Sequence, residues 1–273
     1  MSWLGLLLLL LAGPVLSDGE VCNFRSQWNH VVVEQRQGMR TLRFGETVQS
    51  IYDLKNPNRL VVPYTRTAMV GAVCLGKPQR VLFVGVGGGS MVKYLHRTLP
   101  QCEIDAVDLD AEVLRVAGDY FDLRSDERLH LIAAEGRGFL AQGGPSYDAI
   151  FLDAYGDTDI PTALASEEFL ELVKSRLENR GVVTGNLWGE RINPRYADMV
   201  QTYRQVFSEV HTIQAGSDNR IVLAFPQRAN LSRETLASLA SFLPGLGDLR
   251  GEVLRGYRTP PQEGEVIRDC SVR

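Results

Sequence analysis

A glycine-rich turn is the part of this sequence best suited to holding a ligand against the backbone. Gly85, Gly87 and Gly89 follow a short apolar run and precede a helical pattern that begins at Ser90. Glycines let the backbone approach a ligand closely, and the first amide groups of a helix have no partner within the helix. We therefore predict that these glycines bind a cofactor, with a purely structural strand-to-helix turn as the alternative.

Carboxylates follow three successive apolar runs further along the chain. Asp108 ends one run, and Glu135 and Asp153 come just after the next two. Ligands in open α/β sheets bind at the carboxyl ends of the strands, so acids from three strand ends would meet in one crevice. This convergence predicts an enzyme. We interpret Asp157 and Asp159, in the loop beyond, as surface or helix-cap residues.

Asp108 has the most specific predicted role among these acids. A carboxylate at the end of the second strand of a nucleotide-binding domain accepts hydrogen bonds from ribose hydroxyl groups. NAD and adenosyl sulfonium cofactors both carry that ribose, but the dinucleotide fingerprint ends in Gly or Ala where this chain has Ser90. The sequence therefore favours the sulfonium cofactor. Asp110 is predicted to be a solvated cap of the helix that starts at Ala111.

Composition narrows the range of partners. The 273 residues carry a net charge of -4 and no run of Lys or Arg, which argues against a nucleic-acid partner. The four cysteines are scattered without metal-ligand spacing, so no metal is expected. Cys74 and Cys102 lie in apolar segments and are predicted to be buried thiols.

The N-terminal segment has its own character. Leu4 to Leu11 is almost all leucine, and small residues follow up to Ser17. The run is shorter than the roughly 20 residues of a membrane helix and matches the apolar part of a signal peptide, although no Lys or Arg precedes it. Residues 1–17 are predicted as a signal peptide, with a membrane-associated tail or a misplaced start codon as alternatives. Export implies a periplasmic protein and sulfonium chemistry a cytoplasmic one, so localisation stays open.

Strand and helix patterns alternate from Arg80 onward, which predicts a parallel sheet covered by helices on both faces. The expected strands are Arg80–Gly85, Glu103–Asp108, Leu129–Ala133, Tyr147–Leu152 and Gly181–Asn186, then a hairpin of Glu209–Ile213 and Arg220–Phe225. The expected helices are Ser90–Leu99, Ala111–Phe121, Ser166–Leu177 and Tyr196–Phe207, with a short turn at Phe139 and Leu140. The predicted fold class is α/β: a class I S-adenosylmethionine-type Rossmann domain, whose doubly wound sheet ends in an antiparallel hairpin.

A smaller unit precedes this domain. Three short strands, His30–Glu34, Met39–Phe44 and Thr47–Tyr52, predict a small antiparallel β-domain, and a helix over Leu60–Leu75 leads on from it. The Gly- and Pro-rich tail beyond Pro244 is predicted to be irregular. We therefore expect a β-domain over 24–58, a Rossmann-like catalytic domain over 59–228 and a C-terminal extension over 229–273.

The order of several motifs resembles the spermidine synthase (polyamine aminopropyltransferase) family, and especially its divergent spermidine synthase-like branch. The motifs are the glycine turn, AVDLD, AAEG and FLDAYGDTDIP, preceded by TLRFGETVQSIYD and PYTRTAM. The resemblance covers residues 30–225. It implies transfer of an aminopropyl group from decarboxylated S-adenosylmethionine to a diamine such as putrescine.

The resemblance also implies roles for individual residues. Asp108 would bind the cofactor ribose, Glu135 would contact the adenine, and the three glycines would wrap the cofactor. Asp153 matches the catalytic acid of the family, and Tyr64 and Gln49 match its residues near the substrate. The expected catalytic residues are thus Asp153 and Tyr64, and the expected cofactor-binding residues are Gly85, Gly87, Gly89, Asp108, Glu135 and Gln49.

Two places depart from the pattern of the family. Gly88 stands where the family usually has an Asp that holds the aminopropyl amine, and Thr65 and Arg66 stand where it usually has His and Glu. Arg66 is suited to a carboxylate, such as that of intact S-adenosylmethionine, or to solvent. Trp188 is interpreted either as a residue of the acceptor pocket or as an aromatic at the rim of the core.

The leading functional prediction is a spermidine synthase-like transferase of polyamine biosynthesis that uses decarboxylated S-adenosylmethionine or S-adenosylmethionine and no metal. An S-adenosylmethionine-dependent methyltransferase is one alternative, and a catalytically silent exported protein that binds a nucleoside or polyamine is the other. We expect a polyamine-type small-molecule substrate, no nucleic acid and no stable membrane span. A homodimer is compatible with the sequence, which does not determine it.

Overall fold

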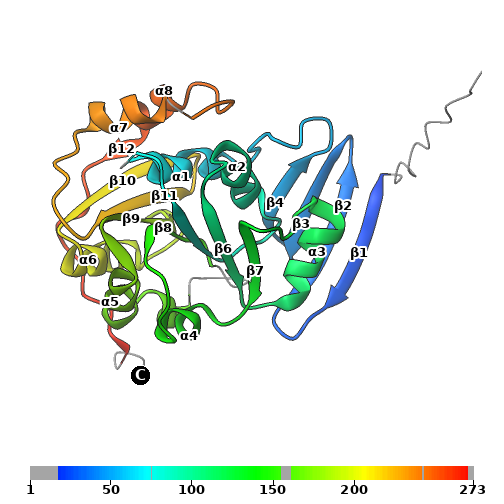
Figure 1. The fold of residues 1–273 in the computed structure, drawn as a ribbon, viewed down its shortest axis with the longest axis horizontal. Helices are drawn as coiled ribbons and strands as arrows, with labels where there is room; N and C mark the ends of the chain where they lie inside the picture. The colour runs from blue at the N-terminus through cyan, green and yellow to red at the C-terminus, as the bar shows by residue number, and fades with distance from the viewer. Residues whose placement is uncertain (1–17, 75, 155–160, 242, 270–273) are drawn as a thin grey trace, which may run out of the picture.

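The computed structural model describes residues 18–74, 76–154, 161–241 and 243–269, which form a small sheet and a large one (Figure 1). The predicted signal peptide, Asp157 and Asp159 lie outside these residues. The small antiparallel sheet has the order β1 (Gly19–Arg25), β2 (His30–Arg36), β3 (Met39–Phe44) and β4 (Thr47–Asp53). Within the described part of the chain, no helix combines the length and apolar character needed to span a membrane.

The large sheet has the strand order β12-β10-β11-β9-β8-β5-β6-β7. Its parallel strands are β5 (Arg80–Val84), β6 (Glu103–Asp108), β7 (Leu129–Ala133), β8 (Tyr147–Leu152) and β9 (Leu177–Trp188). The antiparallel strands are β10 (Glu209–Ala215), β11 (Asn219–Phe225) and the short β12 (Tyr257–Arg258). The strand order reverses between β5 and β8, which is where ligands bind in sheets of this kind. The predicted doubly wound sheet with a terminal hairpin is confirmed.

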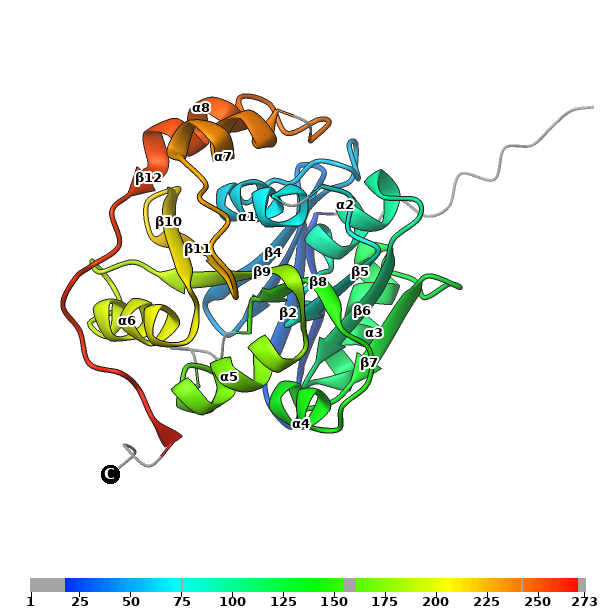
Figure 2. The same ribbon diagram turned by 60° about the vertical axis from the view of Figure 1, so that its left-hand side comes forward.

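Helices cover both faces of the large sheet (Figure 2). One face carries α1 (Pro63–Val73), α2 (Ser90–Thr98), α7 (Arg233–Ala240) and α8 (Leu249–Gly256). The other carries α4 (Gly136–Ala141), the 3-10 helix η1 (Thr162–Leu164), α5 (Glu167–Ser175) and α6 (Tyr196–Val206). The buried residues of these strands are mostly apolar, as a sheet between two helix layers requires.

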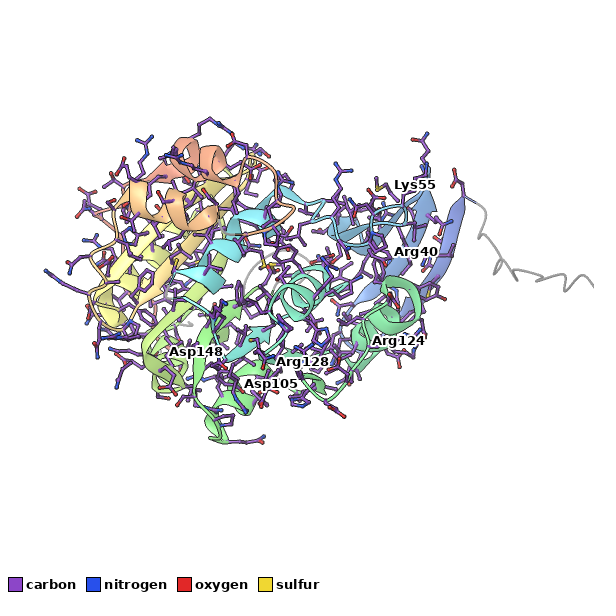
Figure 3. All side chains as sticks on the ribbon, turned by 45° about the horizontal axis from the view of Figure 1, so that its top comes forward. Arg40, Lys55, Asp105, Arg124, Arg128 and Asp148 are labelled. Atoms are coloured by element: carbon purple, nitrogen blue, oxygen red, sulfur yellow. The ribbon has the colours of Figure 1, made fainter. Side chains whose placement is uncertain are left out.

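Helix α3 (Ala111–Phe121) joins the small sheet to the large one. Its buried Val113 and Val116 pack in one apolar cluster with Val31 and Leu42 of the small sheet. Arg40 on β3 adds a hydrogen bond of 2.6 Å to the carbonyl oxygen of Tyr120 at the end of this helix (Figure 3). The small sheet is thereby held against the carboxyl edge of β6, where the predicted site lies.

Two expectations for the N-terminal region need correction. The small sheet has four strands instead of three, because β1 pairs antiparallel with β2. Helix α1 begins at Pro63 instead of Leu60. Proline is favoured at the first helical position, and it keeps the preceding Val62 extended at φ -74° and ψ 126°.

The prediction of an irregular tail beyond Pro244 is wrong for residues 249–258, which form α8 and β12, whereas residues 259–268 contain no helix or strand. Asp248 caps α8 by accepting a hydrogen bond from the amide of Gly251, and Leu249 and Val253, four positions apart, are buried. The turn predicted at Phe139 and Leu140 is helix α4. Strand β9 also starts at Leu177, four residues before the predicted Gly181.

Candidate active site

The carboxyl ends of β5, β6 and β8 border a single cavity of about 640 Å³. Strand β5 lies between the other two in the sheet, so the turn after β5 faces the residues that follow β6 and β8. Strand β4 of the small sheet and the first turn of α1 form other parts of the wall. The cavity has the size of a nucleoside-type ligand with room for a second small molecule.

The glycine turn after β5 has a backbone that only glycine adopts readily. Gly85, Gly87 and Gly89 have φ angles of 91°, 53° and 70°. A Cβ atom on Gly85 would overlap the carbonyl oxygen of Asp153, so this glycine also allows the two strand ends to touch. Gly85 and Gly87 line the cavity, whereas Gly89 is the N-cap of α2 and packs against Leu123.

Asp108, at the end of β6, is tied to the glycine turn. Its carboxylate accepts hydrogen bonds from the amides of Val86 at 2.9 Å and Asp110 at 3.0 Å. Burial raises the pKa of Asp108, and these hydrogen bonds oppose the rise. The side chain lines the cavity in a fixed orientation, as a ribose-binding carboxylate requires.

Asp110 caps α3 as the sequence predicts, but it is buried instead of solvated, and it also anchors the small sheet. It accepts the amide of Glu112 at the start of α3. Its other oxygen accepts hydrogen bonds from Ser26 and, at 2.9 Å, from the side-chain amide of Asn29. Both partners lie between β1 and β2, and Asn29 lines the cavity together with Asp110.

Asp153, directly after β8, is held by two side chains from different elements. Tyr64 on α1 donates its hydroxyl to Oδ2 at 2.9 Å, and Asn186 on β9 donates its side-chain amide to Oδ1 at 2.8 Å. Burial raises the pKa of Asp153 to about 6 despite these hydrogen bonds. The structure therefore brings together the two predicted catalytic residues, Asp153 and Tyr64.

Gln49 and Ser50 on β4 line the cavity beside the glycine turn. The side-chain nitrogen of Gln49 is buried and has no hydrogen-bond partner among the described residues. A buried donor of this kind is costly unless a ligand accepts from it, so this cavity wall fits a ligand with an acceptor atom. Ser50 accepts the amide of Gly88 at 2.8 Å, and a Cβ atom on Gly88 would lie 2.8 Å from that of Ser50.

Glu135 lies where the strand-end pattern predicts, but its carboxylate already has partners. It caps α4 by accepting the amides of Arg137 at 2.9 Å and Gly138 at 2.6 Å. The residue still lines the cavity and is largely exposed to it. Glu135 can therefore offer a remaining lone pair to an adenine amino group while it holds the start of α4.

Arg66 does not line the cavity. Its guanidinium donates to Glu252 on α8 at 3.0 Å and to the carbonyl of Leu60. The expectation that this residue could hold the carboxylate of a cofactor is not supported by its position. Trp188 lines the cavity, so its role as a residue of the acceptor pocket or as a rim aromatic stays a prediction.

Only acidic charges line the described cavity wall. Asp108, Asp110, Glu135 and Asp153 belong to the lining, whereas no Lys or Arg does among the described residues. Such a wall favours cationic ligands. The described residues contain no group of three or more His, Cys, Asp or Glu side chains that could hold a metal ion.

Two other acids serve structure instead of the site. Asp148 at the start of β8 accepts the amides of Gln79 and Arg80 at 2.7 and 3.0 Å, and so fixes the beginning of β5 (Figure 3). Asp105 on β6 is buried between His130 and Tyr147, at 2.8 Å from each. Neither residue lines the cavity.

Sequence reasoning missed Ser50, Asn186 and Asn219. Asn186 was expected only as the end of a strand, and Asn219 only as part of the turn before β11. Both line the cavity, and Asn186 contacts Asp153 directly. A polar residue at the end of an otherwise apolar strand was the available signal for Asn186. Asn219 comes from an antiparallel hairpin whose register the sequence does not reveal.

The doubly wound sheet, its terminal hairpin, the glycine turn and the acid after the second strand define a transferase of the S-adenosylmethionine-type Rossmann class. The family model described as "Spermine/spermidine synthase domain" matches residues 63–215. This chain belongs to the spermine/spermidine synthase family.

Individual relatives agree with this assignment. The polyamine aminopropyltransferase of Vibrio vulnificus is 30% identical over 81% of this chain and 78% of its own length. The structure of a probable spermidine synthase from Corynebacterium glutamicum has a TM-score of 0.76 at 19% identity and covers 91% of this chain and 96% of its own. Human methyltransferase-like protein 13, solved in complex with SAH, has a TM-score of 0.61 at 26% identity over 72% of this chain and 94% of its own. The protein is thus a transferase with ligands related to S-adenosylmethionine.

Proposed function

We propose that this protein transfers the aminopropyl group of decarboxylated S-adenosylmethionine to a diamine such as putrescine. The observation that carries the proposal is the place of Asp153, which Tyr64 and Asn186 orient. The described wall of its cavity has acidic side chains and no Lys or Arg. The donor carries a sulfonium and an ammonium group, and the acceptor is a polycation in water. An acidic cavity attracts both substrates.

The reaction needs a neutral amine aimed at the carbon beside the sulfonium sulfur. The amine nitrogen forms a bond to this carbon while the carbon–sulfur bond breaks, and the electron pair of that bond remains on the sulfur of methylthioadenosine. The amine must also lose a proton. Asp153, with a pKa of about 6, is ionised at neutral pH and basic enough to accept that proton as the new bond forms. Tyr64 keeps one carboxylate oxygen in place.

The donor would lie between the glycine turn and β4. We infer that Asp108 binds the ribose hydroxyls and that Glu135 meets the adenine at the start of α4. Gln49 would donate its unpartnered side-chain nitrogen to an acceptor atom of the same ligand. Gly85 and Gly87 leave the space that the backbone needs to approach it.

Methyl transfer is the competing function, and Gly88 is the observation in its favour. The turn has no carboxylate at this position, and Ser50 occupies the space beside it, so a donor amine lacks that partner. The two functions differ in which carbon next to sulfur is attacked, and both are compatible with an adenosyl site.

Calorimetry and product analysis separate these functions. We expect methylthioadenosine and decarboxylated S-adenosylmethionine to bind more tightly than S-adenosylmethionine and S-adenosylhomocysteine. Incubation of the decarboxylated donor with putrescine should yield spermidine and methylthioadenosine. Preference for S-adenosylmethionine, with S-adenosylhomocysteine as the product, would replace aminopropyl transfer by methyl transfer. Binding of methylthioadenosine without turnover of any donor would leave a silent binding protein.

Two expectations about the whole protein also belong to this proposal. We propose that residues 1–17 act as a signal peptide, which N-terminal sequencing of the protein from its native cell would test: a chain starting near Asp18 agrees, and one starting at Met1 does not. We also propose a homodimer, which sedimentation equilibrium would distinguish from a monomer by mass.

A further inference from the structure

The side chain of Asp153 stands at the end of a chain of hydrogen bonds that runs across the sheet. Asn186 on β9 donates its amide nitrogen to Oδ1 of Asp153 at 2.8 Å. Asn219, at the start of β11, donates its own amide nitrogen to the carbonyl oxygen of Asn186 at 2.9 Å. Asn219 is paired across the antiparallel ladder with Trp188, which places it diagonally beside Asn186.

The carboxylate of Asp153 determines the direction of both hydrogen bonds in this series. An ionised carboxylate only accepts hydrogen bonds, so Asn186 must turn its nitrogen toward Asp153. Its oxygen then faces β11, where a donor is required. Asn219 supplies that donor, and its side-chain nitrogen can satisfy the oxygen of Asn186 only in the orientation observed.

We propose that Asn219 is a positioning residue for the transfer reaction, which acts on Asp153 by fixing the orientation of the Asn186 amide. Without the donor from Asn219, the amide of Asn186 loses the contact that holds it from the β11 side, so its hydrogen bond to the carboxylate weakens. Asp153 would then lose part of the stabilisation of its charged form. The inference deepens the proposed function and rests on it for the role of Asp153 as a base.

Among the described residues, the charged groups near Asp153 and Asn219 give no alternative to this path of hydrogen bonds. Asp153 is approached by the Tyr64 hydroxyl from α1 and by the Asn186 amide from β9, and no charged side chain in the described part of the chain contributes to the shift of its pKa. Asp108, Asp110 and Glu135 are the other titratable groups of the described cavity wall. The charged neighbours of Asn219 in sequence are bound elsewhere, Asp218 to Arg191 and Arg220 to Glu190.

The test compares Asn219→Ala and Asn219→Asp with Asn186→Ala and the double variant Asn186→Ala/Asn219→Ala. Each of these variants should move the acid limb of the pH profile of kcat/KM to higher pH by about 0.5 to 1 pH unit. Each should also lower turnover about 3- to 10-fold, the scale of one hydrogen bond to a charged group. The shift of the acid limb should be larger in Asn219→Asp than in Asn219→Ala, because an acceptor at position 219 reverses the direction of the hydrogen bonds. The double variant should have the same acid limb and the same turnover as Asn186→Ala, because Asn219 acts only through Asn186.

Ser217→Ala, in the same hairpin turn, is the matched control, because Ser217 contacts Asp218 and not the cavity. It should leave the pH profile unchanged. Additive losses in the double variant, or a rise in the KM of the acceptor without a shifted acid limb, would overturn the inference and make Asn219 a direct substrate contact. An unaltered profile in Asn219→Asp would overturn it as well.

A measurement without turnover keeps this test separate from the proposed function. Titration of Asp153 by NMR of protein labelled with 13C at the aspartate carboxyl groups reports its pKa directly, with Asp153→Asn to assign the signal. A higher pKa in Asn219→Ala supports the inference even if the wild-type protein transfers no aminopropyl group. An unchanged pKa overturns it even if the wild-type protein is active.

Discussion

Replacement of Asp153 by Asn should separate the contribution of this residue to catalysis from its contribution to stability. The variant keeps the size of the side chain and one acceptor oxygen but has no base. We expect turnover to fall about 10²-fold or more, the usual effect of losing a general base, while methylthioadenosine binds almost as before. The same change should stabilise the fold at neutral pH.

The size of that stabilisation follows from the pKa of Asp153. The folded protein raises this pKa from 3.8 to about 6 through burial. At 1.36 kcal/mol per pH unit, ionisation of the carboxyl group costs the native state roughly 3 kcal/mol. Asn can replace only part of the two hydrogen bonds that the carboxylate accepts, so we expect a gain of about 1 to 2 kcal/mol in the free energy of unfolding.

The sign of the effect depends on pH. Between pH 3.8 and about 6 the native state binds this proton more strongly than the unfolded chain, so the stability contributed by Asp153 falls as pH rises through this window. Above pH 6 the full cost is present. The advantage of Asp153→Asn should therefore be largest near pH 8 and shrink as the pH falls below about 6.

Urea unfolding at pH 8 and pH 5, with turnover measured in parallel, checks both effects. Asp148→Asn is the matched control, because Asp148 accepts two backbone amides at the start of β5 and lies outside the cavity. It should lose stability at pH 8 and keep its turnover per folded molecule. If Asp153→Asn lost stability at pH 8, or kept its turnover, the reasoning about a buried, destabilised base would be refuted.

Three further changes test the rest of the site. Asp108→Ala should weaken methylthioadenosine binding about tenfold or more in calorimetry, since a hydrogen bond to a charged group contributes about 1.5 to 3 kcal/mol, and unaltered affinity would remove Asp108 from the site. Gly85→Ala should abolish turnover and lower the melting temperature, because the new Cβ atom would overlap the backbone of Asp153, and normal activity would contradict the close approach of β5 and β8. Arg66→Ala should leave the preference between donors unchanged and cost less than about 1 kcal/mol from its ion pair with Glu252, so a reversed donor preference would place Arg66 in the site after all.

The sequence determined the large sheet and its binding edge because both depend on local patterns. Apolar runs such as Tyr147–Leu152 form strands buried on both faces, and the glycine turn needs the positive φ angles that its glycines adopt. Asp108 is the last residue of β6 and Asp153 comes directly after β8, so the carboxyl edge of the sheet brings both to one cavity. The prediction of an irregular tail rests on composition alone and is wrong for α8, which packs against β10.

Only the tertiary structure decided what each of these side chains does. The pKa of Asp153 depends on burial and on Tyr64 and Asn186, which come from positions 89 residues before it and 33 residues after it. The hydrogen bond from Asn219 to Asn186 depends on the register of the antiparallel pair β9 and β11. Arg66 is directed away from the cavity by its ion pair with Glu252 on α8, near the C-terminus. Hydrogen bonds and desolvation act over a few ångströms in space and are independent of separation along the chain, so no local pattern of residues carries this information.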